Sequence, residues 1–229
     1  MANSFSAAAL ILAAGSAKRF GRDKQFASIN KIPVIELTVK NFLKSKKVKE
    51  IIVAFSRDNF EKGRRLFLKE KKVKTVIGGK TRMESLKNAF AALSYKPDIV
   101  CVHDGARPFV DKRLIENLIG NAFKYKAAVP VVPLKDTVKK VSKNKILSTI
   151  DRKSYAAVQT PQCYRTEIFK KIISLPKSSR DLTDDSQLLE EINIKAFAVE
   201  SSYENFKITT PEDLILAEAV YEKKYKKIG

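Results

Sequence analysis

The sequence contains few cysteines and no long apolar segment. Its two cysteines, Cys101 and Cys163, are too few for a disulfide framework, and their spacing matches no metal-ligand pattern. The N-terminal run MANSFSAAALILAAG has no basic residues at its start, and its apolar stretch is too short to span a bilayer. We therefore expect a cytoplasmic protein without a membrane-spanning segment, in which Cys101 is a core residue of the apolar run IVCV.

Several common functional motifs are also missing. The sequence has neither the G-x-G-x-x-G fingerprint of dinucleotide-binding folds nor the G-K-[ST] of a P-loop. It has a single histidine, His103, and no signature of an activated nucleophile, so covalent catalysis is not indicated. It also lacks the clusters of stacking aromatic residues that proteins use to bind single-stranded nucleic acids.

Acidic residues are scarce relative to basic ones, and the formal net charge is +20. The lysines are scattered through nearly every predicted helix, in runs such as KSKKVK, KEKKVK and KKYKK, which is typical of solvated faces. We expect no nucleic-acid partner, although a basic RNA-binding protein remains a remote alternative. A basic surface also favours small anionic substrates.

The apolar pattern predicts an α/β domain with a Rossmann-like, doubly wound and mostly parallel sheet. With 44% hydrophobic residues, the chain can bury a sizeable core. Strands that are apolar on both faces and recur after helical crossovers indicate a parallel sheet covered on both sides. The expected strands are 7–13, 51–55, 74–77, 99–103 and 127–132, with helices near 33–43, 86–93 and 115–123.

The pattern changes after Leu134, where two strand-like runs at 137–141 and 146–150 flank the turn sequence SKNK. Because an isolated hairpin is marginally stable in water, this one should pack against another element, and a partner subunit is the natural candidate. Helices near 167–174 and 184–192, a strand near 196–200 and a helix starting at Thr210-Pro211 should complete the domain. We expect one domain over 1–229, with a hairpin arm at about 137–152.

The first candidate site directly follows the first predicted strand. There Ala13, Ala14 and Gly15 would let backbone N–H groups approach an anion, and two cations, Arg19 and Lys24, follow. Ligands of open α/β sheets bind at the carboxyl ends of the strands, so a triphosphate fits this arrangement. An ordinary turn with surface lysine and arginine is the alternative.

The run LILAAGxxxRxGxxKQ resembles the nucleotide-binding loop of sugar nucleotidyltransferases. Later segments make the resemblance more specific, and in order they are GGKTRMES, HDGARPF, DT, DR, QTPQ, LTDD and KITTPEDL. Together they are similar to the 2-C-methyl-D-erythritol 4-phosphate cytidylyltransferase family of non-mevalonate isoprenoid biosynthesis, from about Ala8 to Tyr221. This resemblance implies a homodimeric enzyme that transfers the cytidylyl group of CTP to a small sugar-alcohol phosphate and releases pyrophosphate.

The resemblance also implies roles for four cations. Arg19 and Lys24, with Mg²⁺ as the cofactor, would neutralise the α-phosphate and the leaving group. Arg152 and Lys207 would hold the attacking phosphate in line with the α-phosphorus. Family members dimerise through the hairpin, which brings side chains into the neighbouring site.

The glycine-rich segment GGKTRMES is expected to bind the nucleotide. Gly78 and Gly79 follow a predicted strand and can approach a base edge closely. In the family this segment, with the serine at the position of Ser85, reads cytosine, and Arg82 is expected to support the loop. Lys80 departs from the family pattern, because many members carry an acidic or small residue there, and this puts base selectivity in doubt. A helix N-terminus capped by Thr81 and Ser85 is the alternative explanation.

On the substrate side the candidates are Asp104, Arg107, Thr137 and Thr160. A carboxylate beside a triphosphate is useful only with a cation between them, so Asp104 is also the candidate Mg²⁺ ligand, directly or through water. His103 is not expected to act as a general base, because a phosphate that attacks a phosphate has no proton for the enzyme to remove. A ribitol 5-phosphate cytidylyltransferase, which shares the fold, the CTP loop and much of HDGARPF, remains the alternative.

Overall fold

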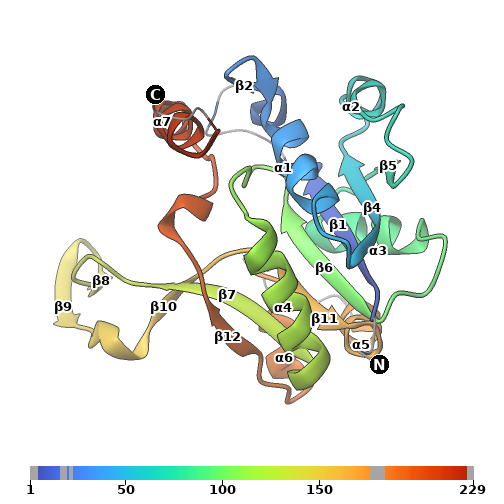
Figure 1. The fold of residues 1–229 in the computed structure, drawn as a ribbon. Helices are drawn as coiled ribbons and strands as arrows, with labels where there is room; N and C mark the ends of the chain where they lie inside the picture. Colours follow the sequence, from blue (N-terminus) through green and yellow to red (C-terminus); the bar gives the residue numbers. More distant parts are fainter. Residues whose placement is uncertain (1–4, 16–19, 21–22, 176–183, 226–229) are drawn as a thin grey trace.

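A computed structural model provides the fold (Figure 1) and describes residues 5–15, 20, 23–175 and 184–225. Its central sheet has eight strands in the order β10-β7-β11-β6-β1-β4-β5, with β12 also paired to β7. The strands of this sheet are β1 (Ala7–Ala13), β4 (Val48–Phe55), β5 (Val73–Ile77), β6 (Ile99–Asp104), β7 (Ala127–Pro133), β10 (Ala156–Val158), β11 (Gln162–Arg165) and β12 (Phe197–Glu200). The helices are α1 (Val34–Leu43), α2 (Phe60–Leu66), α3 (Arg82–Ala91), α4 (Lys112–Tyr125), α5 (Thr166–Ser174), α6 (Gln187–Glu191) and α7 (Glu212–Tyr225).

The two faces of the sheet belong to separate hydrophobic clusters. Strand β1 pairs in parallel with both β4 and β6, and β4 pairs in parallel with β5. On β1, Ala9 and Ile11 pack in one cluster with α1 and α4, whereas Leu10 packs in the other with α3, α5 and α6. Successive side chains of a strand point to opposite faces, so a strand buried on both sides is apolar throughout. The structure confirms the predicted doubly wound α/β fold.

One half of the sheet differs from the predicted series of parallel strands. Strand β11 lies between β6 and β7 and is antiparallel to both, and β10 is antiparallel to β7. The parallel partner of β7 is β12, near the end of the chain. These two antiparallel strands were not predicted, because segments of three and four residues carry too little periodicity.

The predicted hairpin arm is present and projects from the body of the molecule (Figure 1). Its strands are β8 (Lys139–Ser142) and β9 (Lys145–Thr149), and every residue in them is exposed. The turn residues Lys143 and Asn144 have φ values of 45° and 61°, as a two-residue type I′ hairpin turn requires. The arm therefore leaves Val141, Ile146 and Leu147 more than half exposed, at 59%, 68% and 56%.

The segment before α7 is tied to the edge of the sheet. The carboxylate of Asp213 accepts hydrogen bonds from the backbone N–H groups of Thr209 and Thr210, at 2.7 and 2.9 Å, and so ties the first turn of α7 to the segment before it. Ile208 is fully buried, and its N–H donates to the carbonyl of Ala106 at 2.9 Å. These bonds hold the neighbouring Lys207 beside the carboxyl end of β6.

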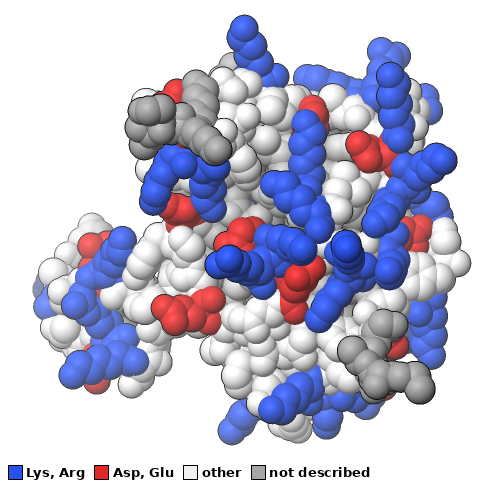
Figure 2. All heavy atoms as spheres, viewed as in Figure 1, with Lys and Arg blue, Asp and Glu red and all other residues white. Residues whose placement is uncertain are grey.

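The distribution of surface charge and the positions of the cysteines match what we expected from the sequence. Figure 2 shows lysine and arginine side chains spread over the visible face, with acidic side chains among them. Cys101 and Cys163 are free, fully buried thiols on the paired strands β6 and β11, so the prediction of a core role for Cys101 is confirmed. Within the part of the chain that the structure describes, no helix is long and apolar enough to cross a membrane.

Candidate active site

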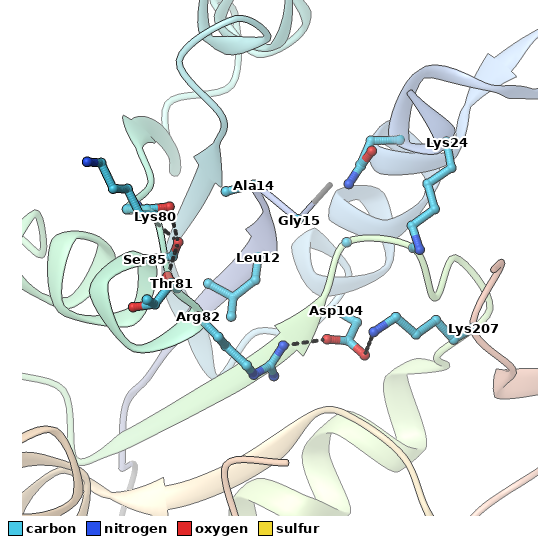
Figure 3. Close-up of a pocket in the computed structure, with 14 residues that line it drawn as sticks. Leu12, Ala14, Gly15, Lys24, Lys80, Thr81, Arg82, Ser85, Asp104 and Lys207 are labelled. Atoms are coloured by element: carbon cyan, nitrogen blue, oxygen red, sulfur yellow. Dashed lines mark hydrogen bonds and ion pairs between the residues drawn. The ribbon is translucent and has the colours of Figure 1, made fainter. Parts of the chain in front are cut away.

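A pocket of about 530 Å³ opens at the carboxyl ends of β1 and β6 (Figure 3). It lies at the sheet edge where the sequence predicted ligand binding. The lining residues come from the ends of β1 and β6, a short 3-10 helix, the first turn of α3 and four loops. They are Leu12, Ala14, Gly15, Lys24, Gln25, Gly79, Lys80, Thr81, Arg82, Ser85, Asp104, Gly105, Ala106 and Lys207.

Asp104, the last residue of β6, is the acidic residue among those described lining positions. One carboxylate oxygen accepts from the Arg82 guanidinium at 3.0 Å, and the other lies 2.9 Å from the Lys207 ammonium. Arg107 also approaches the second oxygen, at 3.5 Å. A single carboxylate thus holds together cations from three separate segments, two of which line the pocket.

The charge state of Asp104 follows from these neighbours. Its burial disfavours the ionised form, but the positive charges of Lys207, Arg82 and Arg107 outweigh that effect and hold the pKa of the carboxyl far below its usual range. The carboxylate is therefore ionised at every pH at which the protein is expected to work.

Arg82, the first residue of α3, has a second carboxylate partner that the sequence reading gave no role. Its Nε and Nη2 donate to Asp185 at 2.9 and 2.6 Å. Burial lowers the pKa of Arg82, and the two carboxylates raise it by more, so the guanidinium stays charged. Neither hydrophobic periodicity nor a general sequence motif marks Asp185 as a site residue. It belongs to the LTDD segment, one of those on which the family resemblance rests.

The loop after β1 forms one wall of the pocket. Ala14 and Gly15 line it, whereas Ala13 is buried at the end of β1. The Gly105 N–H donates to the carbonyl of Leu12 at 2.8 Å and so joins this loop to the loop after β6.

Lys24 enters the same pocket from a short 3-10 helix, Lys24–Phe26. Its ammonium and that of Lys207 both point toward the side where Asp104 lies (Figure 3). Gln25 also lines the pocket and was missed by the sequence reading, while the predicted Arg19 and the residues Leu182 and Thr183 of LTDD lie outside the described residues.

The opposite wall is the glycine-rich segment before α3. The Ser85 hydroxyl accepts from the Gly79 N–H at 3.0 Å and donates to the carbonyl of Thr81 at 3.0 Å. The Lys80 N–H is held by the Glu84 carboxylate at 2.8 Å, and the Lys80 ammonium is directed away from Asp104 (Figure 3). Thr81 is the N-cap of α3, as the helix-cap explanation predicted, whereas Ser85 lies inside the helix and caps none of its described N–H groups. The cap at Thr81 is compatible with a binding site in this loop.

Thr160 and His103 form buried hydrogen bonds that hold the end of β6 and the loop after it. The Thr160 hydroxyl accepts from the Asp104 N–H at 3.0 Å and lies 3.0 Å from His103 Nδ1. The other ring nitrogen, Nε2, lies 3.1 Å from the carbonyl of Arg107, so Nε2 carries the proton and Nδ1 accepts from Thr160. His103 is fully buried, and this burial lowers its pKa to about 3. It is a neutral structural side chain that holds the β6 loop.

A pH dependence of stability follows from His103. In the folded state the ring stays neutral down to about pH 3, whereas in the unfolded chain it takes up a proton near pH 6.5. Acid therefore favours unfolding, so this contribution is complete above pH 6.5 and is lost as the pH falls toward 3. Between pH 6 and 5 we expect the free energy of unfolding to fall by about 1 kcal/mol more than in His103→Gln, as measured by urea titration. Equal slopes for the two proteins would contradict the neutral, buried ring.

The remaining predicted residues lie outside the pocket. Arg107 is largely buried, and its Nη1 donates to the carbonyl of Asn205 at 2.9 Å. Thr137 is exposed at the base of the arm. Arg152 is exposed in a 3-10 helix at the end of the arm, and it donates to the carbonyl of Lys135. Neither Thr137 nor Arg152 is among the described residues that line the pocket.

The donor set suits a magnesium ion held mainly by phosphate. In the described residues no three His, Cys, Asp or Glu side chains gather as a metal site. Asp104 supplies one carboxylate, and both of its oxygens already face cations. Mg²⁺ in nucleotide sites commonly keeps several waters and takes one or two carboxylates besides the phosphates. Contact with Asp104 through water therefore fits the geometry better than direct ligation.

The fold and the site together define a nucleotidyltransferase, with a loop of small residues and several cations at the carboxyl edge of a doubly wound sheet. The family model described as IspD: 2-C-methyl-D-erythritol 4-phosphate cytidylyltransferase matches residues 7–223. The chain therefore belongs to this family, which confirms the resemblance in the sequence.

Individual relatives agree. The chain is 43% identical over 219 residues to the 2-C-methyl-D-erythritol 4-phosphate cytidylyltransferase of Endomicrobium trichonymphae, covering 93% of this chain and 97% of the relative. It is 40% identical over 216 residues to that of a Bacillus cereus strain, with coverages of 92% and 95%. Among solved structures, the 4-diphosphocytidyl-2C-methyl-D-erythritol synthase of Anaerococcus prevotii superposes with a TM-score of 0.85 at 29% identity, over 96% of this chain and 97% of the other.

Proposed function

We propose that this protein transfers the cytidylyl group of CTP to 2-C-methyl-D-erythritol 4-phosphate, forming 4-diphosphocytidyl-2-C-methyl-D-erythritol and pyrophosphate. The observation that carries the proposal is the pocket itself, in which Arg82 and Lys207 flank Asp104 and Lys24 lines the same cavity beside Ala14 and Gly15. Membership in the family supports the identity of both substrates.

The chemistry requires positioning and charge neutralisation. An anionic phosphate oxygen attacks the α-phosphorus of CTP in line with the leaving pyrophosphate, so no proton has to be removed. The barrier comes from bringing two anions together and from the charge that develops around the phosphorus. Lys24, together with the predicted Arg19, neutralises the α-phosphate and the leaving group, and Lys207 holds the attacking phosphate.

The nucleotide half of the site has matching donors. The backbone N–H groups of Ala14 and Gly15 face the triphosphate, and the segment around Gly79 and Ser85 faces the cytosine. Because the Lys80 ammonium is directed away from Asp104, we assign the reading of the base to Ser85 and the backbone despite the departure at Lys80 from the family pattern. A magnesium ion, when bound, would supply Lewis-acid stabilisation of phosphate oxygens, with Asp104 as its outer ligand.

The hairpin arm belongs to the proposal as a dimer contact. Its exposed apolar residues, Val141, Ile146 and Leu147, need a covering surface, and a second copy of the chain provides one. In such a dimer Arg152 of each arm would reach the sugar-phosphate side of the neighbouring pocket, together with Thr137. Sedimentation velocity tests this assembly, and a monomer at assay concentrations would contradict it.

The first test is pyrophosphate release with CTP and Mg²⁺, with 2-C-methyl-D-erythritol 4-phosphate and ribitol 5-phosphate supplied in parallel. Turnover of the methylerythritol phosphate alone would support the proposal. Turnover of ribitol 5-phosphate alone would support the CTP site and would show that the proposed acceptor is wrong.

CTP is a cytoplasmic metabolite, so a cytoplasmic location is part of the same proposal.

Replacing Arg152 tests the acceptor side. We expect Arg152→Ala to raise KM for the sugar phosphate about tenfold or more and to leave CTP binding unchanged, because the side chain contacts only the attacking phosphate. Steady-state kinetics and titration calorimetry measure the two effects. Lys153→Ala, which removes the same charge from the next exposed position, is the control. Weaker CTP binding in Arg152→Ala would contradict this role.

A further inference from the structure

Two acidic residues before α6 have no part in the proposed chemistry, although both turn inward. Asp184 accepts a hydrogen bond from the Ser186 N–H at 2.7 Å and another from the side-chain amide of the fully buried Gln162. Asp185 is 1% exposed. Helix α6 begins at Gln187, three residues later than the predicted 184.

The Asp185 carboxylate holds the guanidinium of Arg82 at two points. The distances are 2.9 Å from Nε to one oxygen and 2.6 Å from Nη2 to the other, although the residues lie 103 positions apart in the chain. A two-point contact between a planar guanidinium and a carboxylate fixes orientation as well as distance. The remaining nitrogen, Nη1, is directed to Asp104 at 3.0 Å.

The contacts continue across the pocket as a row of alternating charges. Asp185 holds Arg82, Arg82 holds one oxygen of Asp104, and the other oxygen of Asp104 meets Lys207 at 2.9 Å. Figure 3 shows the last three members of this row, with Asp104 between the two cations. Only Asp185 lies outside the pocket lining, and it is the most buried of the four.

From this row we infer that Asp185 is a positioning residue for the transfer reaction: it holds Arg82 so that Arg82 orients Asp104 and, through Asp104, the ammonium of Lys207. A single contact from Asp104 would leave the Arg82 guanidinium free to rotate. The inference rests on the proposed function, because it takes Lys207 as the cation that holds the attacking phosphate.

A purely structural ion pair is the alternative, and it makes a different prediction. Buried ion pairs add little net stability compared with apolar packing, so stability alone is a weak explanation for this one. A structural role would lower the melting temperature and leave the rate constant of the folded enzyme intact. A positioning role acts on kcat through Arg82 and disappears when Arg82 is absent.

The test is a double-mutant cycle in the full-length protein. We expect Asp185→Asn to lower kcat about tenfold or more while KM for each substrate changes less than about threefold, because the lost interaction acts in the transition state. We expect Arg82→Met to lower kcat as well, and Asp185→Asn to cause less than a twofold further loss when added to it. Circular dichroism at the assay temperature checks that each variant is folded.

The control is Glu50→Gln at the opposite edge of the sheet. Glu50 is a buried carboxylate that pairs with the half-exposed Lys74 at 2.9 Å, so its replacement reproduces the loss of a buried, paired carboxylate away from the site. It should lower the melting temperature and leave kcat within twofold.

Three results would overturn the inference: a kcat for Asp185→Asn within twofold of wild type, losses that multiply fully in the double variant, or an equal loss in Glu50→Gln. If Asp185→Asn does not fold, Asp185→Glu tests the positioning role instead, because it keeps the negative charge and displaces the carboxylate. We expect a fall in kcat of about fivefold there, and an unchanged kcat would refute the positioning role. Failure of the proposed function itself is recognised separately, since the wild-type protein would then show no turnover.

Discussion

Lys24→Ala is expected to lower kcat about 100-fold or more, which is the scale of one lost transition-state contact. Lys24 is a cation that lines the pocket beside Ala14 and Gly15, where the triphosphate is proposed to bind. Its charge matters most when negative charge accumulates on the α-phosphate and the leaving pyrophosphate. Most of the loss should therefore appear in kcat, as measured by steady-state pyrophosphate release.

The matched control for this variant is Lys87→Ala. Lys87 is exposed on α3, the helix that also supplies Arg82 and Ser85, and it does not line the described pocket. This change removes the same charge and places a good helix former in a helix, so kcat should stay within twofold. A loss below about fivefold in Lys24→Ala would remove Lys24 from the transition-state role that we propose.

Asp104→Asn is the second variant for which we expect a large effect. The change keeps the shape of the side chain and removes the negative charge that Arg82, Lys207 and Arg107 share. We expect kcat to fall about 100-fold, because Lys207 and Arg82 lose their common anchor and the proposed outer ligand of magnesium is removed. We also expect unfolding to become easier by about 3 kcal/mol, as for a broken buried ion pair.

The pH dependence of Asp104 provides an independent check. Because its pKa lies well below the usual value for aspartate, the carboxylate keeps its charge as the pH falls through 5, and its contribution to stability is lost only below pH 4. The wild-type kcat profile should therefore show no acid limb from Asp104 above pH 5. A limb near pH 6 that disappears in Asp104→Asn would contradict this charge state.

Asp98→Asn is the control for the same strand. Asp98 directly precedes β6 at its other end, is exposed, and binds Ser6 at 2.7 Å. It should leave kcat unchanged, which would separate a local effect at the pocket from a general effect of removing an acid near β6.

The fold was predictable to the extent that its strands are buried on both faces. The residues of β1 and β4 are almost all apolar, and such runs separated by amphipathic helices leave few alternatives to a parallel sheet. The hairpin arm was predictable from its turn, since Asn144 readily adopts a positive φ. Strands β10 and β11 were not predictable, because each is too short to show a period and their direction depends on neighbours distant in the sequence.

The site was predictable where its residues directly follow strands. Ala14, Gly15 and Asp104 lie at strand ends, and the rule that parallel strands present their carboxyl ends at one edge brings them together. Gln25 and Asp185 were missed as site residues, because neither residue type stands out at its position in the sequence. The roles proposed for Arg152 and Thr137 depend on a second subunit and stay predictions.

The sequence by itself determined the class of fold, the family and the loops that carry the chemistry, because these depend on local composition and on motifs in a fixed order. Only the tertiary structure decided which charges meet. The contact between Arg82 and Asp185 spans 103 positions, and Lys207 reaches Asp104 because Ile208 is bonded to the loop after β6. Such contacts depend on the order of strands in the sheet and on how each loop packs, and neither is encoded in the periodicity of a single segment.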